Sequence, residues 1–111
     1  MATHALTEAE KLARAPGIVY ADGPAGRRAK IEGGLDVFEL VRAWQSLDGD
    51  LTTLAENYPW MTLEQVQAGL RFYQLFPVEI DEWLAREREI ASRLEAAPSV
   101  TPDLLRELAE L

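Results

Sequence analysis

Residues 36–97 consist of helix-forming stretches separated by prolines and capping residues. These helix start and stop signals limit the possible folds more than any other feature of the sequence. Pro59 cannot continue a helix and therefore ends one stretch, whereas Pro77 suits the first turn of the next. Asp50 is a favourable N-cap. Thr62, with a glutamine three residues later, forms a capping box that marks another helix start. Apolar residues at helical spacing between these marks predict four consecutive helices, over 36–47, 51–57, 63–75 and 77–97.

A β-hairpin is predicted ahead of these helices. The β-prone run 18–21 and the run 27–31 are separated by Asp-Gly-Pro-Ala-Gly, so the economical interpretation is two strands joined by a five-residue loop. The Gly33-Gly34 pair ends the second strand. A short helix over 5–14, ended by Pro16-Gly17, precedes the hairpin. The expected fold is mainly α: a helix-turn-helix-like helical domain with a short N-terminal β-hairpin and a long C-terminal helix.

Three segments are expected along the chain. Residues 1–16 form an N-terminal helical extension, residues 17–76 form the hairpin and helix-turn-helix domain, and residues 77–111 form a helical partner-binding region. Within the last segment, residues 97–100 are a linker, and a final helix follows over 101–111. The length of 111 residues fits one domain with short extensions.

Composition excludes several classes of protein. The chain has no cysteine, which rules out disulfides and thiolate metal sites. Its first residues lack the basic and apolar stretches of a signal peptide, and no apolar run approaches the roughly 20 residues of a membrane helix. We therefore expect a cytoplasmic protein that does not enter a membrane.

The net charge of -8 argues against general attraction to nucleic acid, but the charge is unevenly distributed. Residues 1–49 carry six cations against seven acidic residues, whereas residues 50–111 carry five cations against twelve. Any nucleic-acid surface is therefore expected to draw on the first half of the chain. The acidic second half should face other partners.

The predicted helices 51–57 and 63–75, joined by a tight connection, have the dimensions of a helix-turn-helix motif, whose second helix lies in the major groove of DNA. At about 100° per residue, one stripe of this second helix carries Glu64, Gln67, Arg71 and Gln74. The two glutamines and the arginine can donate to base edges or phosphates, whereas phosphate repels the glutamate. The alternative is an ordinary antiparallel helix pair with a solvated glutamine stripe.

The densest basic cluster, Arg27, Arg28 and Lys30, lies in the second predicted strand. In a strand, Arg28 and Lys30 share one face and Arg27 lies on the other. The functional interpretation is phosphate contact beside the helix-turn-helix. The alternative is a charged edge strand that discourages aggregation. The sequence leaves both open.

The region 77–111 has an apolar seam that needs a covering surface. In its long helix, Trp83, Ile90 and Leu94 recur by threes and fours, with one interrupting charge at Glu87. These three residues are the expected anchors for a partner protein, because buried aromatic and aliphatic side chains dominate such interfaces. The alternative is that the helix simply covers its neighbour. Two i,i+4 ion pairs are predicted on the same helix, Glu82–Arg86 and Glu89–Arg93.

Catalysis and metal binding have little support in the sequence. His4 is the only histidine, and no activated nucleophile pattern occurs. The acidic residues of 79–89 ring a predicted surface helix and do not converge, which is typical of a solvated face. We expect no enzymatic activity, no cofactor, no metal site and no small-molecule substrate.

Two parts of the chain resemble the small prokaryotic family known as domain of unknown function 433. The first part is the hairpin region Gly17–Ile31, followed by Leu35–Val41. The second is Leu54–Pro59 followed by Met61–Leu70, where Glu-Asn-Tyr-Pro-Trp-Met-Thr-Leu-Glu-Gln-Val is similar to the family's signature of an acidic-Tyr-Pro turn and a capped helix. The similarity covers about residues 17–84.

The resemblance implies a helix-turn-helix or winged-helix-like domain with an N-terminal β-hairpin, commonly a homodimer. Many such proteins are taken to be antitoxins of type II toxin–antitoxin pairs, of the VapB kind, beside a PIN-like ribonuclease toxin. By that analogy the N-terminal part binds operator DNA and the C-terminal helices neutralise the toxin. A PIN-like nuclease holds Mg²⁺ in a carboxylate cluster that an antitoxin arginine can occupy, and the candidate arginines are Arg86, Arg88 and Arg93.

The leading hypothesis is therefore a dimeric antitoxin that binds a PIN-like toxin and its own operator. The alternative is a dimeric protein–protein adaptor on the same scaffold that does not bind DNA. The net charge of -8 and Glu64 favour the adaptor, whereas the basic cluster and the glutamine–arginine stripe favour the antitoxin.

Overall fold

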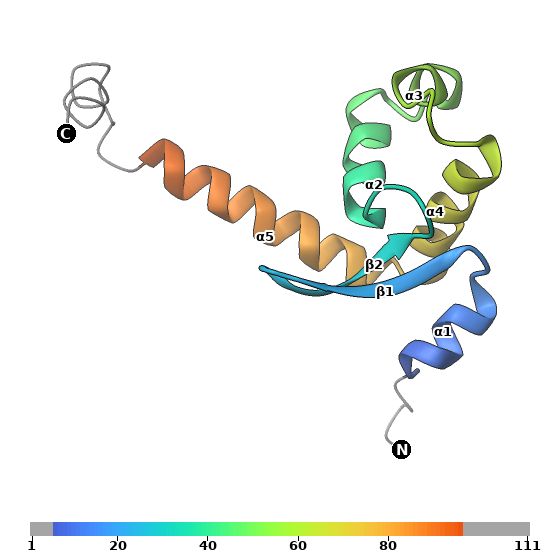
Figure 1. Ribbon diagram of the computed structural model, residues 1–111. Coiled ribbons are helices and arrows are strands. Elements are labelled where there is room, and N and C mark those ends of the chain that lie inside the picture. Colours follow the sequence, from blue (N-terminus) through green and yellow to red (C-terminus); the bar gives the residue numbers. More distant parts are fainter. Residues whose placement is uncertain (1–5, 97–111) are drawn as a thin grey trace, which may run out of the picture.

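The computed structural model describes residues 6–96, which form five helices and one two-stranded hairpin (Figure 1). The predicted fold class is confirmed, with the hairpin near the N-terminus and a long helix at the C-terminal end. The final helix expected over 101–111 lies outside the described residues. In chain order the elements are α1 (Glu8–Arg14), β1 (Ile18–Gly23), β2 (Gly26–Ile31), α2 (Val37–Ser46), α3 (Leu51–Asn57), α4 (Leu63–Leu75) and α5 (Pro77–Ala96).

The hairpin is tighter than predicted. Pairing of β1 with β2 continues to Gly23 opposite Gly26, so only Pro24 and Ala25 form the turn, and the expected five-residue loop is wrong. Proline presets φ at the first turn position, and Gly26 takes a φ of +125°, a region that favours glycine. The glycines that suggested a long loop are therefore the ends of the two strands.

The core lies where the hairpin, α2, α4 and α5 meet, with α4 at its centre. Gly69 of α4 is buried, and a methyl group there would lie 2.6 Å from Leu40 of α2 and 2.7 Å from Ile31 of β2. This glycine therefore lets three elements approach closely. The buried apolar residues are Ala15, Ile18, Ala29, Ile31, Val37, Leu40, Val41, Leu54, Met61, Val66, Phe72, Ile80 and Leu84.

The starts of α3 and α4 are as predicted. Thr62 accepts the backbone N–H of Gln65 at 3.1 Å, and the Gln65 side chain accepts the N–H of Thr62 at 2.7 Å, which completes the capping box. Gln65 also donates to the carbonyl of Glu32 at 3.1 Å and so ties α4 to the end of the hairpin. Asp50 caps α3, and hydrogen bonds from the Thr53 hydroxyl and then from backbone N–H groups lower the pKa of its carboxyl.

One polar cluster attaches α1 to the rest of the molecule. Lys11 of α1 donates to Glu79 of α5 at 2.5 Å, and the Tyr20 hydroxyl of β1 donates to the same carboxylate at 2.9 Å. Burial, followed by the Glu79 carboxylate, raises the pKa of Tyr20. Glu79 thus joins α5 to α1 and β1, which lie more than 50 residues earlier in the sequence.

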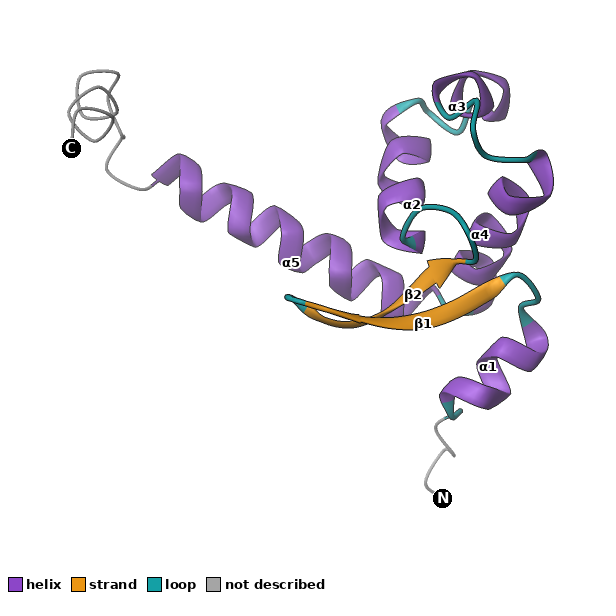
Figure 2. Ribbon diagram, viewed as in Figure 1, coloured by secondary structure: helices purple, strands orange, loops and turns teal. Residues whose placement is uncertain are grey.

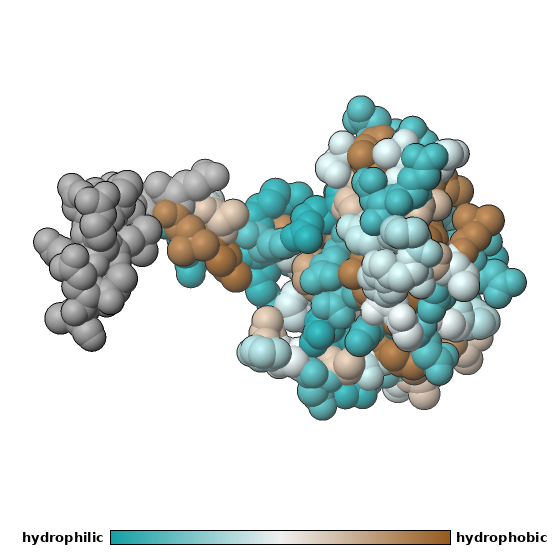
Figure 3. All heavy atoms as spheres, turned by 45° about the horizontal axis from the view of Figure 1, so that its top comes forward, coloured by the Kyte–Doolittle hydropathy of each residue, from teal (hydrophilic) through white to brown (hydrophobic). Residues whose placement is uncertain are grey.

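Only the first half of α5 is covered by the domain. Its first turns pack on α2 and α4, with Ile80 and Leu84 buried. Beyond them the helix leaves the body and extends past the tip of the hairpin (Figures 1 and 2), and its projecting part carries hydrophobic side chains (Figure 3). We call residues 85–96 the α5 arm. Among the described helices, none combines the length and the hydropathy needed to cross a membrane.

Candidate binding surfaces

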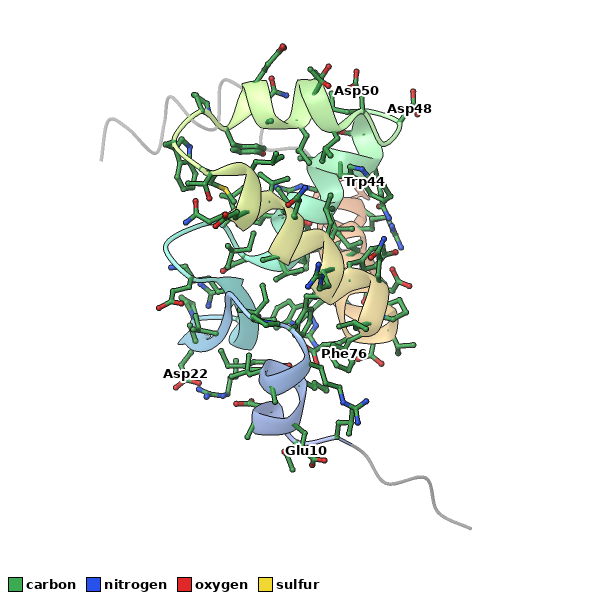
Figure 4. The ribbon with its side chains drawn as sticks, turned by 90° about the vertical axis from the view of Figure 1, so that its right-hand side faces the viewer. Glu10, Asp22, Trp44, Asp48, Asp50 and Phe76 are labelled. Atoms are coloured by element: carbon green, nitrogen blue, oxygen red, sulfur yellow. The ribbon has the colours of Figure 1, made fainter. Side chains whose placement is uncertain are left out.

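Both helices of the predicted helix-turn-helix are present, as α3 and α4, and residues 58–62 connect them. The hairpin, α2 and α5 cover one side of α4 and leave the other side open to solvent (Figure 4). The residues of α4 that were predicted to contact DNA lie together on this open side. It carries the exposed residues Glu64, Gln67, Arg71 and Gln74, which we call the α4 stripe.

The α4 stripe is a shallow and accessible surface. Gln67, Arg71 and Gln74 line one hollow together with Leu70, and a second hollow along the stripe extends to Pro16. No hydrogen bond or ion pair joins the stripe's side chains to other residues within 6–96. The stripe therefore offers free donors to a polar ligand.

The first turn of α4 is less suited to DNA. In helix-turn-helix proteins the N-terminal residues of the recognition helix contact base edges. Here Thr62 and Gln65 hold each other in the capping box, Leu63 is exposed, and Glu64 adds a negative charge. The only cation of the helix, Arg71, lies two turns further on.

The basic cluster of the hairpin is already partly neutralised. Arg27 donates to carboxylates of α1 and β1 at 2.8 and 3.2 Å, and these bonds raise its pKa. Arg28 donates to Asp36 at 2.6 Å. The Lys30 side chain has no partner in the described part of the chain. The strand register places Arg28 and Lys30 on one face and Arg27 on the other, as predicted.

The segment between Arg42 and Arg71 contains no lysine, arginine or histidine. It forms the end of α2, all of α3 and the first half of α4. A surface of this sign repels a phosphate backbone. Its four acidic side chains, all exposed, are Asp48, Asp50, Glu56 and Glu64.

Aromatic side chains form a small apolar surface where α5 leaves the domain. Trp83 stacks on Phe38 of α2, with ring centroids 5.6 Å apart and ring planes at 14°. The guanidinium of Arg86 lies 4.5 Å from the centroid of the Trp83 ring. These residues line a shallow hollow with Ile90. Three of the predicted partner-binding residues therefore meet, and Phe38, which no sequence pattern indicated, packs with them.

Two charged side chains of this part of α5, Glu87 and Arg86, have contacts other than those predicted. Glu87, which interrupts the apolar seam, accepts a hydrogen bond from Arg42 of α2 at the edge of the domain. The predicted ion pair between Glu82 and Arg86 is absent, because the guanidinium lies over the neighbouring indole ring instead. A contact with Trp83, three residues earlier on the same helix, therefore replaces one of the two expected i,i+4 pairs.

The α5 arm carries the remaining predicted partner-binding residues. Ile90 is 52% exposed and Leu94 is 73% exposed. Both lie on the continuation of the helix face of Trp83, because Ile90 is about two helical turns beyond Trp83 and Leu94 is one turn beyond Ile90. The apolar strip therefore runs from the domain onto the arm without cover.

The three arginines of α5 differ in position. Arg86 and Arg93 are four and three residues from Ile90 and flank it, whereas Arg88, two residues away, lies on another face. Arg93 forms the predicted pair with Glu89 at 2.6 Å. Arg88 has no partner among residues 6–96.

One exposed apolar surface was not predicted. Leu63 and Val66 are three residues apart and share a helix face, but Leu63 is 55% exposed while Val66 is fully buried. Leu51 and Trp60 are exposed near the same end of the molecule. Which turn of a helix is covered depends on neighbours that are distant in sequence, so no local signal could have identified this surface.

Polar clusters within 6–96 connect elements and do not form a recognisable catalytic centre. No group of three or more histidine and carboxylate side chains in this range is placed to hold a metal ion. The Tyr73 hydroxyl donates to Asp81 at 2.7 Å, and this bond, followed by burial, raises the pKa of Tyr73. That contact joins α4 to α5. The absence of enzymatic activity and of a cofactor stays a prediction.

Comparison of the chain with models of protein families, with curated proteins and with solved structures gives no match. The resemblance to the domain of unknown function 433 therefore stays a prediction that rests on the motifs quoted above.

Proposed function

We propose that this chain is an antitoxin-type protein that holds a partner, a PIN-like ribonuclease, through the α5 arm. The observation that carries the proposal is the uncovered strip of Ile90 and Leu94 on a helix that has left its own domain. An amphipathic helix of this kind fits into an apolar groove of another protein. The choice of a nuclease as the partner comes from the resemblance of residues 17–84 to an antitoxin-containing family.

The arginines beside the strip supply the polar part of the contact. A partner that covers Ile90 also meets Arg86 and Arg93, which flank it. Guanidinium groups match carboxylates in shape and charge, and a PIN-like nuclease offers a carboxylate cluster. Arg93 is the better candidate to enter that cluster, because its side chain is 76% exposed and its exposed pair with Glu89 is worth little.

A second candidate function is DNA binding through the α4 stripe. Gln67, Arg71 and Gln74 support it, because they are exposed donors without partners within 6–96. The acidic surface ahead of Arg71 and the pairing of Arg27 and Arg28 oppose tight binding. A homodimer compensates in part, since a second weak site raises the overall affinity. Without DNA binding, the chain is a dimeric protein–protein adaptor.

The test of the arm uses the full chain and a PIN-like nuclease, which is to be sought among the products of the genes next to its own. Complex formation and inhibition of RNA cleavage are measured as the chain is titrated into the nuclease. Leu94→Asp should weaken binding about tenfold or more, because a charge replaces an interface anchor. Val78→Asp is the matched control, since Val78 is a 67% exposed aliphatic residue on the first turn of the same helix.

A second pair of variants tests the arginine. Arg93→Ala should reduce inhibition of the nuclease, whereas Arg88→Ala, on another face of the same helix, should leave inhibition unchanged. Equal losses from Leu94→Asp and Val78→Asp would exclude the arm as the binding surface. Absence of a complex with the unaltered chain would exclude the nuclease as the partner.

A further inference from the structure

A second apolar surface lies between α3 and the start of α4, and Figure 1 shows these two helices on the other side of the molecule from the α5 arm. Leu51 is 37% exposed and Leu63 is 55% exposed. They face an open hollow of about 490 Å³ between the two helices. Its lining residues are Leu51, Thr52, Ala55, Glu56 and Leu63, and we call it the α3–α4 hollow.

Trp60 extends the apolar surface at this end of the molecule. It lies in the connection between α3 and α4, three residues before Leu63, and is 59% exposed. The ring of Tyr58 lies edge-on to it, with centroids 6.4 Å apart, which restricts its orientation. Large apolar side chains left in water and grouped near a hollow are typical of a protein interaction site.

The charge around the hollow limits what can occupy it. Glu56 lines the hollow and Glu64 follows Leu63, and both are exposed. The sequence supplies no cation between Arg42 and Arg71. A second copy of this chain would bring like charges together, and nucleic acid would be repelled by the same carboxylates. A basic polypeptide is the occupant with complementary charge.

We propose that the α3–α4 hollow binds a segment of another protein in which large apolar side chains are flanked by lysine or arginine. The apolar side chains pack between Leu51 and Leu63, and the flanking cations pair with Glu56 and Glu64 at the rim. This site is separate from the α5 arm. It does not depend on the proposed function, so either proposal can fail without the other.

Three synthetic peptides of roughly 14 residues, about four helical turns, test the site. The first is an amphipathic leucine–lysine helix, the second has glutamate in place of lysine, and the third is the first in scrambled order, so that its leucines share no face. Each is titrated into the isotope-labelled full chain. The leucine–lysine peptide should bind about tenfold more tightly than the other two and shift the backbone amide signals of residues 51–56 and 60–64.

Variants then locate the contact. Leu63→Asn should lower the affinity of the leucine–lysine peptide about tenfold, whereas Ile90→Asn, at a comparably exposed aliphatic residue of the arm, should leave it unchanged. Leu51→Asn repeats the test from the other wall of the hollow, and thermal unfolding confirms that each variant is folded. Equal binding of the scrambled peptide, signal shifts confined to α5, or equal effects of Leu63→Asn and Ile90→Asn would overturn the proposal.

Discussion

Arg28 donates to the carboxylate of Asp36 at 2.6 Å, and the Asp36 side chain makes this contact in place of capping α2, the helix that follows it. Asp36 occupies the N-cap position of α2, but its side chain accepts no N–H group of that helix. The Asp36 side chain is only 11% exposed. Loss of Arg28 would therefore leave a poorly hydrated carboxylate without a partner, which is unfavourable. The pair therefore fixes the hairpin against α2.

Gly23 leaves room for this ion pair, because a methyl group there would overlap the Nη1 atom of Arg28. We expect Gly23→Ala to displace the guanidinium from Asp36 and to lower the free energy of unfolding by about 1–2 kcal/mol. In an Arg28→Ala background the same change should have little effect. Urea denaturation of the two single variants and the double variant measures the coupling. Additive effects would show that Gly23 acts independently of the ion pair.

Gly69 provides a second test of packing. Alanine is favoured over glycine by about 1 kcal/mol in a helix, but the added methyl group would press on Leu40 and Ile31 in the core. We expect the crowding to dominate, so that Gly69→Ala lowers the free energy of unfolding by about 1–2 kcal/mol. Gln67→Ala, at an exposed position of the same helix, is the control in urea denaturation. A stabilised Gly69→Ala variant would mean that the core can expand at this point.

The starts of α3, α4 and α5 were predictable because their signals act within one turn, whereas the helix expected over 5–14 begins only at Glu8. Thr62 and Gln65 cap each other, Asp50 caps α3, and Pro77 begins α5, as the sequence indicates. Each of these interactions joins residues at most three apart. No tertiary contact is needed to form them, so the elements they begin follow from the sequence alone.

Whether a candidate site residue is free or already paired depends on contacts with residues far away in the sequence. The sequence shows Arg27 and Arg28 as a basic cluster, but it cannot show that Glu8 and Asp36, from other elements, accept their hydrogen bonds. Trp83 was expected to be an anchor for a partner protein. Its stacking on Phe38 could not be predicted, because it depends on how α5 crosses α2. The exposure of a residue, and therefore its availability for binding, is fixed by the packing of distant elements.

Tyr20 should make stability fall at alkaline pH. Burial and the Glu79 carboxylate raise its pKa in the folded state above the ordinary value of about 10. As pH rises past 10, the unfolded chain loses a proton that the folded chain keeps, so the free energy of unfolding decreases. Below that pH the contribution is fully present.

Urea denaturation at intervals from about pH 9 to 11.5 measures this effect. Tyr20→Phe should flatten the decline, and Glu79→Gln should reduce it, because the neutral amide still accepts the hydrogen bond but no longer opposes ionisation. The raised pKa of Tyr73 beside Asp81 leaves a residual slope, which Tyr73→Phe should remove. An unchanged slope in Tyr20→Phe would show that Tyr20 ionises as freely in the folded chain as in the unfolded one.

Arg71 and Arg28 give opposite expectations for DNA binding. The Arg71 guanidinium is free within 6–96, so Arg71→Ala should reduce the slope of log affinity against log salt by about 1. Arg28 is held by Asp36, so Arg28→Ala should leave the slope unchanged. Anisotropy of a labelled duplex from upstream of the gene, at about 50 to 200 mM salt, measures both. A larger change for Arg28→Ala would place the DNA on the hairpin, and no binding at the lowest salt would favour the adaptor function.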